Sequence, residues 1–173
     1  MEKLTCRFSI PDQKGALVEL LNSLPKGLSI GDMQYGYSQP GNQSPVISLI
    51  VSEEKRNGLL ESLEERFPEL EVLTENIKGE YRMIEFSREL LNIPVFLEVE
   101  FPERAGALKA FMEQISKYAN LFYFNYQYSG ERVGHALVGV SFESEDHQRE
   151  ARNLIQELTP RVVRSVKPLE KIR

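Results

Sequence analysis

The residues best suited to chemistry lie in two turns that share a pattern of proline, glycine, alanine and leucine. Pro11 is followed by Gly15, and Pro102 by Gly106, with alanine and leucine directly after each glycine. A proline that ends a strand and a glycine that opens a helix leave free backbone N–H groups at the positive end of the helix dipole. Each turn can therefore receive a carboxylate. The alternative is structural: the glycine simply allows a tight connection between strand and helix.

These turns belong to an internal repeat of the chain. Pro102 lies 91 positions after Pro11 (102 − 11 = 91). The same offset superimposes two alternating apolar runs, which predict strands, and two apolar faces with the i, i+3, i+4, i+7 spacing of a helix. The strand positions are Leu4, Cys6, Phe8 and Ile10 with Val95, Leu97, Val99 and Phe101, and the helix positions are Leu17, Leu20, Leu21 and Leu24 with Leu108, Phe111, Met112 and Ile115.

Each half continues with two strands, a second helix and a last strand. These are residues 33–38, 46–51, 60–67 and 70–77 in the first half, and residues 124–129, 137–142, 151–158 and 161–167 in the second. The order β-α-β-β-α-β is that of a ferredoxin-like sandwich, with helices on one face of an antiparallel sheet. We therefore predict an α+β fold of two tandem ferredoxin-like sandwiches, at residues 1–78 and 95–173, joined by a connecting segment at 79–94. Ile30 and Leu121 have the wrong parity for their strands, which indicates a later strand start or a β-bulge.

The strength of the individual interactions limits what such a turn can bind. A helix dipole contributes roughly 0.3 to 1 kcal/mol, whereas micromolar affinity needs about 8 kcal/mol. Burial of a side chain of leucine or isoleucine size adds roughly 1.5 to 3 kcal/mol, and an ammonium group needs acceptors from a neighbouring strand. A branched amino acid between the two repeats would satisfy all three requirements.

Composition and charge exclude several classes of function. A formal net charge of −5 and a pI near 5.3 give no broad basic surface for duplex nucleic acid or anionic membranes. The chain has neither a secretory signal nor a run of about 18 apolar residues, so we expect a cytoplasmic protein. The single cysteine, Cys6, has no partner for an internal disulfide, and its apolar position predicts a core residue. The aromatic strand around Tyr126 could stack bases, but the ribonucleoprotein signature is absent from the strand that follows it.

Catalytic motifs are also missing. The sequence contains no nucleophile elbow, phosphate loop, metal-binding helix motif or dinucleotide fingerprint. His135 and His147 are the two histidines, and we expect both to be structural or solvated. We therefore predict a protein that is not an enzyme and that has neither a cofactor nor a metal site.

Three segments of the second half resemble the ACT-like regulatory domain of biosynthetic threonine deaminase (threonine dehydratase, C-terminal region). They are Phe101–Leu108, Asn120–Tyr126 and Gly134–Val140. The first half resembles the same module through its turn and its Met33–Tyr35 strand, so the resemblance implies tandem ACT-like domains over nearly the whole chain. In that family such domains bind isoleucine as inhibitor or valine as activator, at interfaces between modules, and control a separate pyridoxal-phosphate catalytic domain. The two repeats and their connection leave no room here for that catalytic domain.

The turns and the resemblance together predict the ligand-binding residues. These are Asp12, Gly15, Ala16, Leu17, Glu103, Arg104, Gly106, Ala107, Leu108, Asn125, Tyr126 and Gln127. The family's Phe-His-Tyr-Arg segment falls on residues 124–127, so Asn125 replaces histidine and Gln127 replaces arginine. Both substitutions retain hydrogen-bonding capacity but remove a cation.

The expected function is that of a non-catalytic, allosteric amino-acid sensor of branched-chain amino acid metabolism. Its expected partners are isoleucine or valine, further copies of the chain, and a catalytic domain or subunit of the threonine deaminase type. The alternative is an oligomerisation or protein-interaction module that has lost ligand binding and associates through exposed sheet edges. The polar side chains Tyr123, Asn125 and Gln127, which we expect to face outward, favour the sensor, because the centre of a purely structural interface is more often apolar.

Overall fold

The computed structural model describes residues 2–11, 15–26, 28–36, 42–73, 92–102, 106–128, 133–159 and 161–169. The first half contains β1 (Glu2–Arg7), β2 (Ile10–Pro11), α1 (Ala16–Ser23), β3 (Ser29–Gly36), β4 (Asn42–Gln43), β5 (Val46–Val51), α2 (Glu53–Arg66) and β6 (Glu71–Val72). The second half contains β7 (Val95–Pro102), α4 (Ala107–Ile115), β8 (Asn120–Tyr128), β9 (Val133–Ser141), α5 (Glu145–Leu158) and β10 (Ser165–Leu169). None of the helices in these ranges is long and apolar enough to cross a membrane.

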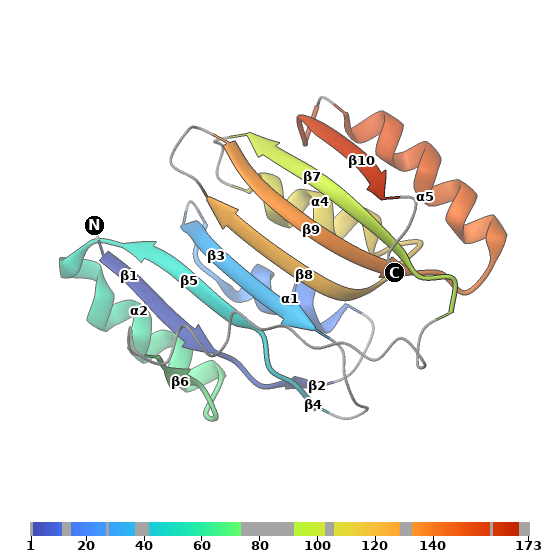
Figure 1. The fold of residues 1–173 in the computed structure, drawn as a ribbon. Coiled ribbons are helices and arrows are strands. Elements are labelled where there is room, and N and C mark those ends of the chain that lie inside the picture. Colours follow the sequence, from blue (N-terminus) through green and yellow to red (C-terminus); the bar gives the residue numbers. More distant parts are fainter. Residues whose placement is uncertain are drawn as a thin grey trace.

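Both halves have the strand order of a ferredoxin-like fold, which confirms the predicted fold class. The first half is ordered β6-β1-β5-β3 and the second β10-β7-β9-β8, with antiparallel pairing throughout. Figure 1 shows the helices of both halves on the same side of the strands. The predicted limits of the two repeats and of the connecting segment stay predictions, since residues 74–91 lie outside the described ranges.

The two halves join into one eight-stranded sheet. Strands β3 and β8 pair antiparallel at its centre, so the order runs β10-β7-β9-β8-β3-β5-β1-β6 (Figure 1). Gln34 lies directly opposite Asn125, and these two residues are equivalent in the repeat (125 − 34 = 91). A pseudo-twofold axis therefore passes through this pair and relates the two halves.

The core lies between the sheet and its helices and extends through both halves. Alternate strand residues such as Cys6, Met33 and Phe124 are fully buried and meet the apolar helix faces around Leu20 and Phe111. Helices α1 and α4 pack against each other behind the central strands. Because one hydrophobic cluster includes residues of both repeats, the core is shared and not divided at the repeat boundary.

The structure corrects one predicted strand and explains the two residues of wrong parity. The first apolar run was expected to form one strand through Ile10, but β1 ends at Arg7 and Ile10 pairs with Gln43 in a separate two-stranded ribbon. The backbone N–H of Phe8 donates to Pro45 O at 2.9 Å at this break. The parity change at Ile30 and Leu121 is due to a β-bulge in each half, because the register of each strand shifts directly after that residue.

Candidate functional site

A cavity of about 660 Å³ lies between the two halves, at one end of the β3–β8 pair. The first half contributes the end of α1 and the residues after it, namely Leu21, Leu24, Pro25, Lys26, Leu28, Ser29 and Ile30, together with Ile50. The second half contributes the end of β7, the start of α4 and one residue of β8, namely Phe101, Pro102, Gly106, Ala107, Leu108, Lys109, Ala110, Glu113 and Tyr126. A molecule bound here would contact both repeats.

The polar end of the cavity is the start of α4. Gly106 is the N-cap residue, with φ of +90°, a conformation that an L side chain rarely adopts. Gly106 has no side chain that could cap this helix, and no described residue does so, which leaves its first backbone N–H groups for an anion. Gly15, with φ of +86°, starts α1 in the same way. Both glycines therefore begin a helix, at the positions that the sequence predicted.

The wall of the cavity is apolar and well supported. Leu21, Leu24 and Leu108 are buried, and the ring of Tyr126 meets that of Phe101 edge-on, with centroids 5.7 Å apart. Gly134 leaves space for the same tyrosine, since a Cβ atom there would lie 2.5 Å from its ring. The position of Tyr126 is therefore set by the neighbouring strands β7 and β9.

Three charged side chains complete the lining. Lys26 follows α1, whereas Lys109 and Glu113 lie one turn apart on α4. Neither lysine forms an ion pair with the part of the chain that the structure describes. Cations and a carboxylate beside an apolar wall form a chemical complement to the carboxylate, ammonium and side chain of an apolar amino acid.

The structure brings together only part of the predicted site. Gly106, Ala107, Leu108 and Tyr126 line the cavity. Gly15, Ala16 and Leu17 lie at the start of α1, which the pseudo-twofold axis places at the opposite end of the β3–β8 pair. Glu103, Arg104 and Asp12 lie outside the described residues.

Asn125 and Gln127 point away from the helices. Their neighbours Phe124 and Tyr126 are buried in the core, and successive side chains of a strand alternate between its faces. The Oδ1 atom of Asn125 is buried and has no hydrogen-bond partner among the described residues. Asn125 therefore has an unsatisfied acceptor on the face of the sheet opposite to the described helices, next to Gln34.

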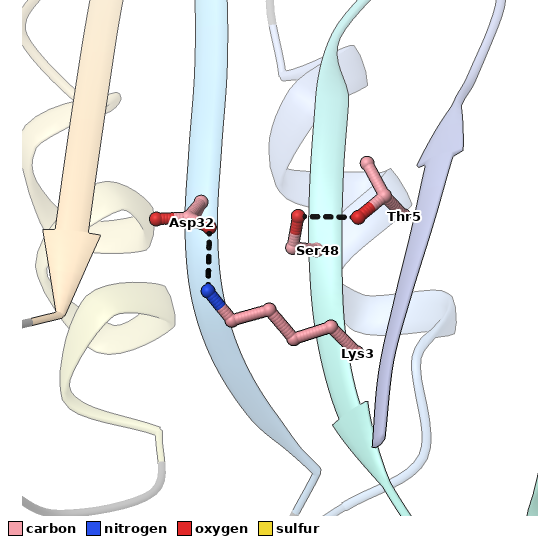
Figure 2. Close-up of polar contacts among 4 residues, drawn as sticks. All are labelled: Lys3, Thr5, Asp32 and Ser48. Carbon is pink, nitrogen blue, oxygen red and sulfur yellow. Dashed lines mark hydrogen bonds and ion pairs between the residues drawn. The ribbon is translucent and has the colours of Figure 1, made fainter. Parts of the chain in front are cut away.

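The same face, opposite to the described helices, carries polar contacts across the first half (Figure 2). Thr5 and Ser48, both buried, share a hydrogen bond of 2.7 Å between β1 and β5. Beside them Lys3 reaches over β5 to Asp32, with 3.2 Å between Nζ and Oδ2. These contacts connect the three strands β1, β5 and β3.

Three further candidate residues lie outside the cavity, namely Cys6 in the core and His135 and His147 at the surface. Cys6 is fully buried, and desolvation raises the pKa of its thiol from 9.0 to about 11, with a smaller contribution from Glu64 and an opposing one from Arg56. His135 and His147 are exposed and lie 3.9 and 4.0 Å from the carboxylates of Glu100 and Glu143. Within the described ranges, no group of three or more His, Cys, Asp or Glu side chains is arranged to hold a metal ion.

Sequence reasoning missed the charged residues of the cavity. Lys109 and Glu113 follow Gly106 at the i+3 and i+7 positions of the same helix, a spacing that could have placed them on the face next to the turn. No sequence signal marks Lys26, Ile30 or Ile50, because these residues reach the cavity only through the pairing of β3 with β8.

Comparison with known proteins agrees with this architecture. Residues 90–167 match the family described as the C-terminal regulatory domain of threonine dehydratase. The chain is 27% identical over 162 residues to a threonine dehydratase of Nicotiana attenuata, and this alignment covers 88% of the chain and 26% of that protein. It is 26% identical over 166 residues to the biosynthetic L-threonine dehydratase IlvA of Escherichia coli K12, and this alignment covers 87% of the chain and 30% of that protein.

The chain thus spans less than a third of the length of these relatives. Among solved structures, the regulatory subunit of aspartate kinase from Thermus thermophilus is similar at a TM-score of 0.33 and 14% identity, over 88% of this chain and 91% of that one. The part of threonine dehydratase that the family match identifies is the regulatory domain, not the catalytic one. The chain therefore resembles the ACT-like regulatory region of threonine dehydratase over most of its length, as its sequence predicted.

Proposed function

We propose that this chain is a non-catalytic regulatory unit that senses a small apolar amino acid, with isoleucine or valine as its effector. The observation that supports this most directly is the cavity between the repeats, which combines an uncapped helix start, an apolar wall and charges of both signs. The resemblance to the regulatory region of threonine dehydratase supports the same class of ligand. The regulated partner would be a catalytic domain or subunit of the threonine dehydratase type.

The cavity provides a separate site for each part of the ligand. The carboxylate would lie at the start of α4, and Glu113 would receive the ammonium group. The branched side chain would pack between Leu24 and Leu108. Its burial contributes roughly 1.5 to 3 kcal/mol, and hydrogen bonds to charged groups contribute about 1.5 to 3 kcal/mol each, so micromolar affinity is within reach.

Regulation would follow from the position of the ligand between the repeats. The effector would contact α1 and its following turn on one side and α4 on the other, and these helices also pack against each other. A ligand that binds one arrangement of the two helices more tightly shifts the population toward it. That shift would be transmitted to the catalytic partner through the sheet or the helix layer.

The proposal is tested by a thermal-shift screen of the chain against the twenty amino acids. A ligand that binds only the native state raises its stability by RT ln(1 + [L]/Kd), so isoleucine or valine should raise the melting temperature in a saturable way. Glu113→Gln should reduce this shift because the ligand's ammonium group loses its partner. Glu150→Gln, an exposed position on α5, changes the charge equally and should leave the shift intact. A flat screen with folded protein would contradict the proposal.

The alternative function is an oligomerisation module without a ligand, and one feature of the sheet favours it. Strand β6 pairs only with Cys6 and Arg7, so no described strand covers the outer edge of β1 from Glu2 to Leu4. An open strand edge can pair with another chain. A flat amino-acid screen combined with a concentration-dependent mass in light scattering would support this alternative.

A further inference from the structure

The pseudo-twofold axis creates a second position equivalent to the cavity, which we call the twin position. It lies where α1 starts, and its residues follow from those of the cavity by the 91-residue offset (106 − 15 = 91). Gly15 corresponds to Gly106 and Tyr35 to Tyr126. The backbone is nearly the same at both, with φ of +86° at Gly15 and +90° at Gly106, and no described side chain caps either helix. The two tyrosines are also equally buried, at 8% and 7% exposure.

The charged residues of α4 that line the cavity, in contrast, have no counterparts of the same charge in α1. The position of Lys109 is occupied by Val18, and that of Glu113 by Asn22. Ala110 corresponds to Glu19, which lies in the first turn of α1. A carboxylate at this place interacts favourably with the helix dipole itself and repels a second carboxylate. The twin position therefore replaces a cation by an anion next to the helix start.

The lysine that both positions share is also used differently. Lys26 at the cavity corresponds to Lys117 at the twin position (117 − 26 = 91). Lys117 donates a hydrogen bond to Gln114 Oε1 at 2.9 Å. Lys26 takes part in no ion pair within the described ranges and lines the cavity. Lys26 lines the cavity together with a second cation, Lys109. At the twin position, Val18 stands in the place of Lys109.

We propose that Lys109 selects which of the two equivalent positions accepts a carboxylate ligand, so that each chain binds one amino acid at the cavity and none at the twin position. This inference rests on the proposed sensor function and deepens it. The fold supplies two equivalent helix starts, and among the described residues the first turn of α4 carries Lys109 whereas the first turn of α1 carries Glu19. The bound chain is therefore asymmetric, because its ligand contacts the end of α1 and the start of α4 but not the reverse pair.

The first test is the stoichiometry of isoleucine and valine binding to the whole chain by isothermal titration calorimetry. One ligand per chain is expected. Two ligands per chain would overturn the inference while leaving the sensor function intact. Absence of binding would overturn both.

Variants then test the role of Lys109. Lys109→Met should raise the Kd for isoleucine by about tenfold or more, since a charge-assisted contact is lost. Lys117→Met removes the lysine of the twin position, which is equivalent to Lys26, and should leave the Kd unchanged. Isoleucinol, which lacks the carboxylate, distinguishes charge recognition from a structural effect, because Lys109→Met should not change its affinity. Equal affinity of Lys109→Met and the unmodified chain for isoleucine would overturn the inference.

A gain-of-site variant provides an independent test. The triple variant Val18→Lys with Glu19→Ala and Asn22→Glu gives α1 the residues found at the equivalent positions of α4. It should raise the stoichiometry from one to two ligands per chain. Unchanged melting temperature without ligand would show that the variant is folded, and a stoichiometry that remains at one in that folded variant would overturn the inference.

Discussion

At the scale of single residues, Asn125 is the polar side chain whose environment fits its chemistry least well. Its neighbours in β8 are packed in the core, while its own side chain lies on the other face with a buried, unpartnered Oδ1 atom. A buried acceptor without a donor costs about 1 to 3 kcal/mol. Because Asn125 sits on the pseudo-twofold axis opposite Gln34, this cost arises at the joint between the repeats.

Replacement of Asn125 by leucine should therefore stabilise the chain. We expect Asn125→Leu to raise the free energy of unfolding by about 1 kcal/mol, because the unsatisfied acceptor is removed at similar volume. Urea denaturation followed by circular dichroism measures this change. Gln127→Leu, an exposed position on the same face, is the control and should remain within about 0.5 kcal/mol. A loss of stability in Asn125→Leu would mean that the amide makes a favourable interaction in solution.

At the scale of elements, the sharpest constraint is the close packing of β8 against β9. A Cβ atom on Gly134 would lie 2.5 Å from Tyr126, and one on Gly139 would lie 2.7 Å from Phe122. These two glycines allow aromatic residues to lie across the neighbouring strand. One of these aromatics, Tyr126, is also a wall of the cavity. Gly134 therefore connects the packing of β8 against β9 to the wall of the cavity, where we propose that the ligand binds.

Substitution of Gly134 by alanine should affect both properties. Overpacking against the Tyr126 ring should cost about 1 to 3 kcal/mol of stability and should reduce the thermal shift produced by isoleucine. Gly58→Ala provides a matched control in the middle of α2, where a Cβ atom would meet nothing within 4 Å. That variant should be more stable than the unmodified chain by roughly 0.5 to 1 kcal/mol, because alanine favours the helix. Equal stability of the two variants would contradict this view of the β8–β9 packing.

At the scale of the whole molecule, the two repeats form one structural unit. They share the β3–β8 pair, the contact between α1 and α4, and a single hydrophobic cluster. Separation of the halves would expose two strand edges and part of this cluster to water. The repeats should therefore unfold together, although each has a complete set of strands and helices.

Unfolding in urea should accordingly be a single transition. Far-ultraviolet circular dichroism and tyrosine fluorescence should give the same midpoint, and the chain contains no tryptophan to complicate the second signal. Phe111→Ala, a core change in the second repeat, should cost about 3 to 5 kcal/mol and should lower the midpoint of the whole chain. Two separate transitions in either protein would show that the repeats fold independently.

The sequence by itself determined the local elements and their order. Side-chain periodicity is a property of a strand or helix taken alone, so the runs from Leu4 and Val95 and the helix faces from Leu17 and Leu108 could be placed from their spacing. The repeat identified Gly106, Ala107 and Leu108 as a helix start, and the aromatic strand added Tyr126. These four residues line the cavity.

Only the tertiary structure decided how the repeats join and therefore where the cavity lies. The strand edges of β3 and β8 pair through backbone N–H and C=O groups, which are the same in every residue and leave no mark in the sequence. That pairing brings Lys26 and Ile50 to the start of α4. The orientation of Asn125 and Gln127 away from Tyr126, in contrast, follows from the alternation of side chains along one strand and was expected from the sequence. Strand pairing likewise determines that β1 ends at Arg7. Periodicity could not show this end, because the alternation of buried residues continues through Phe8 and Ile10.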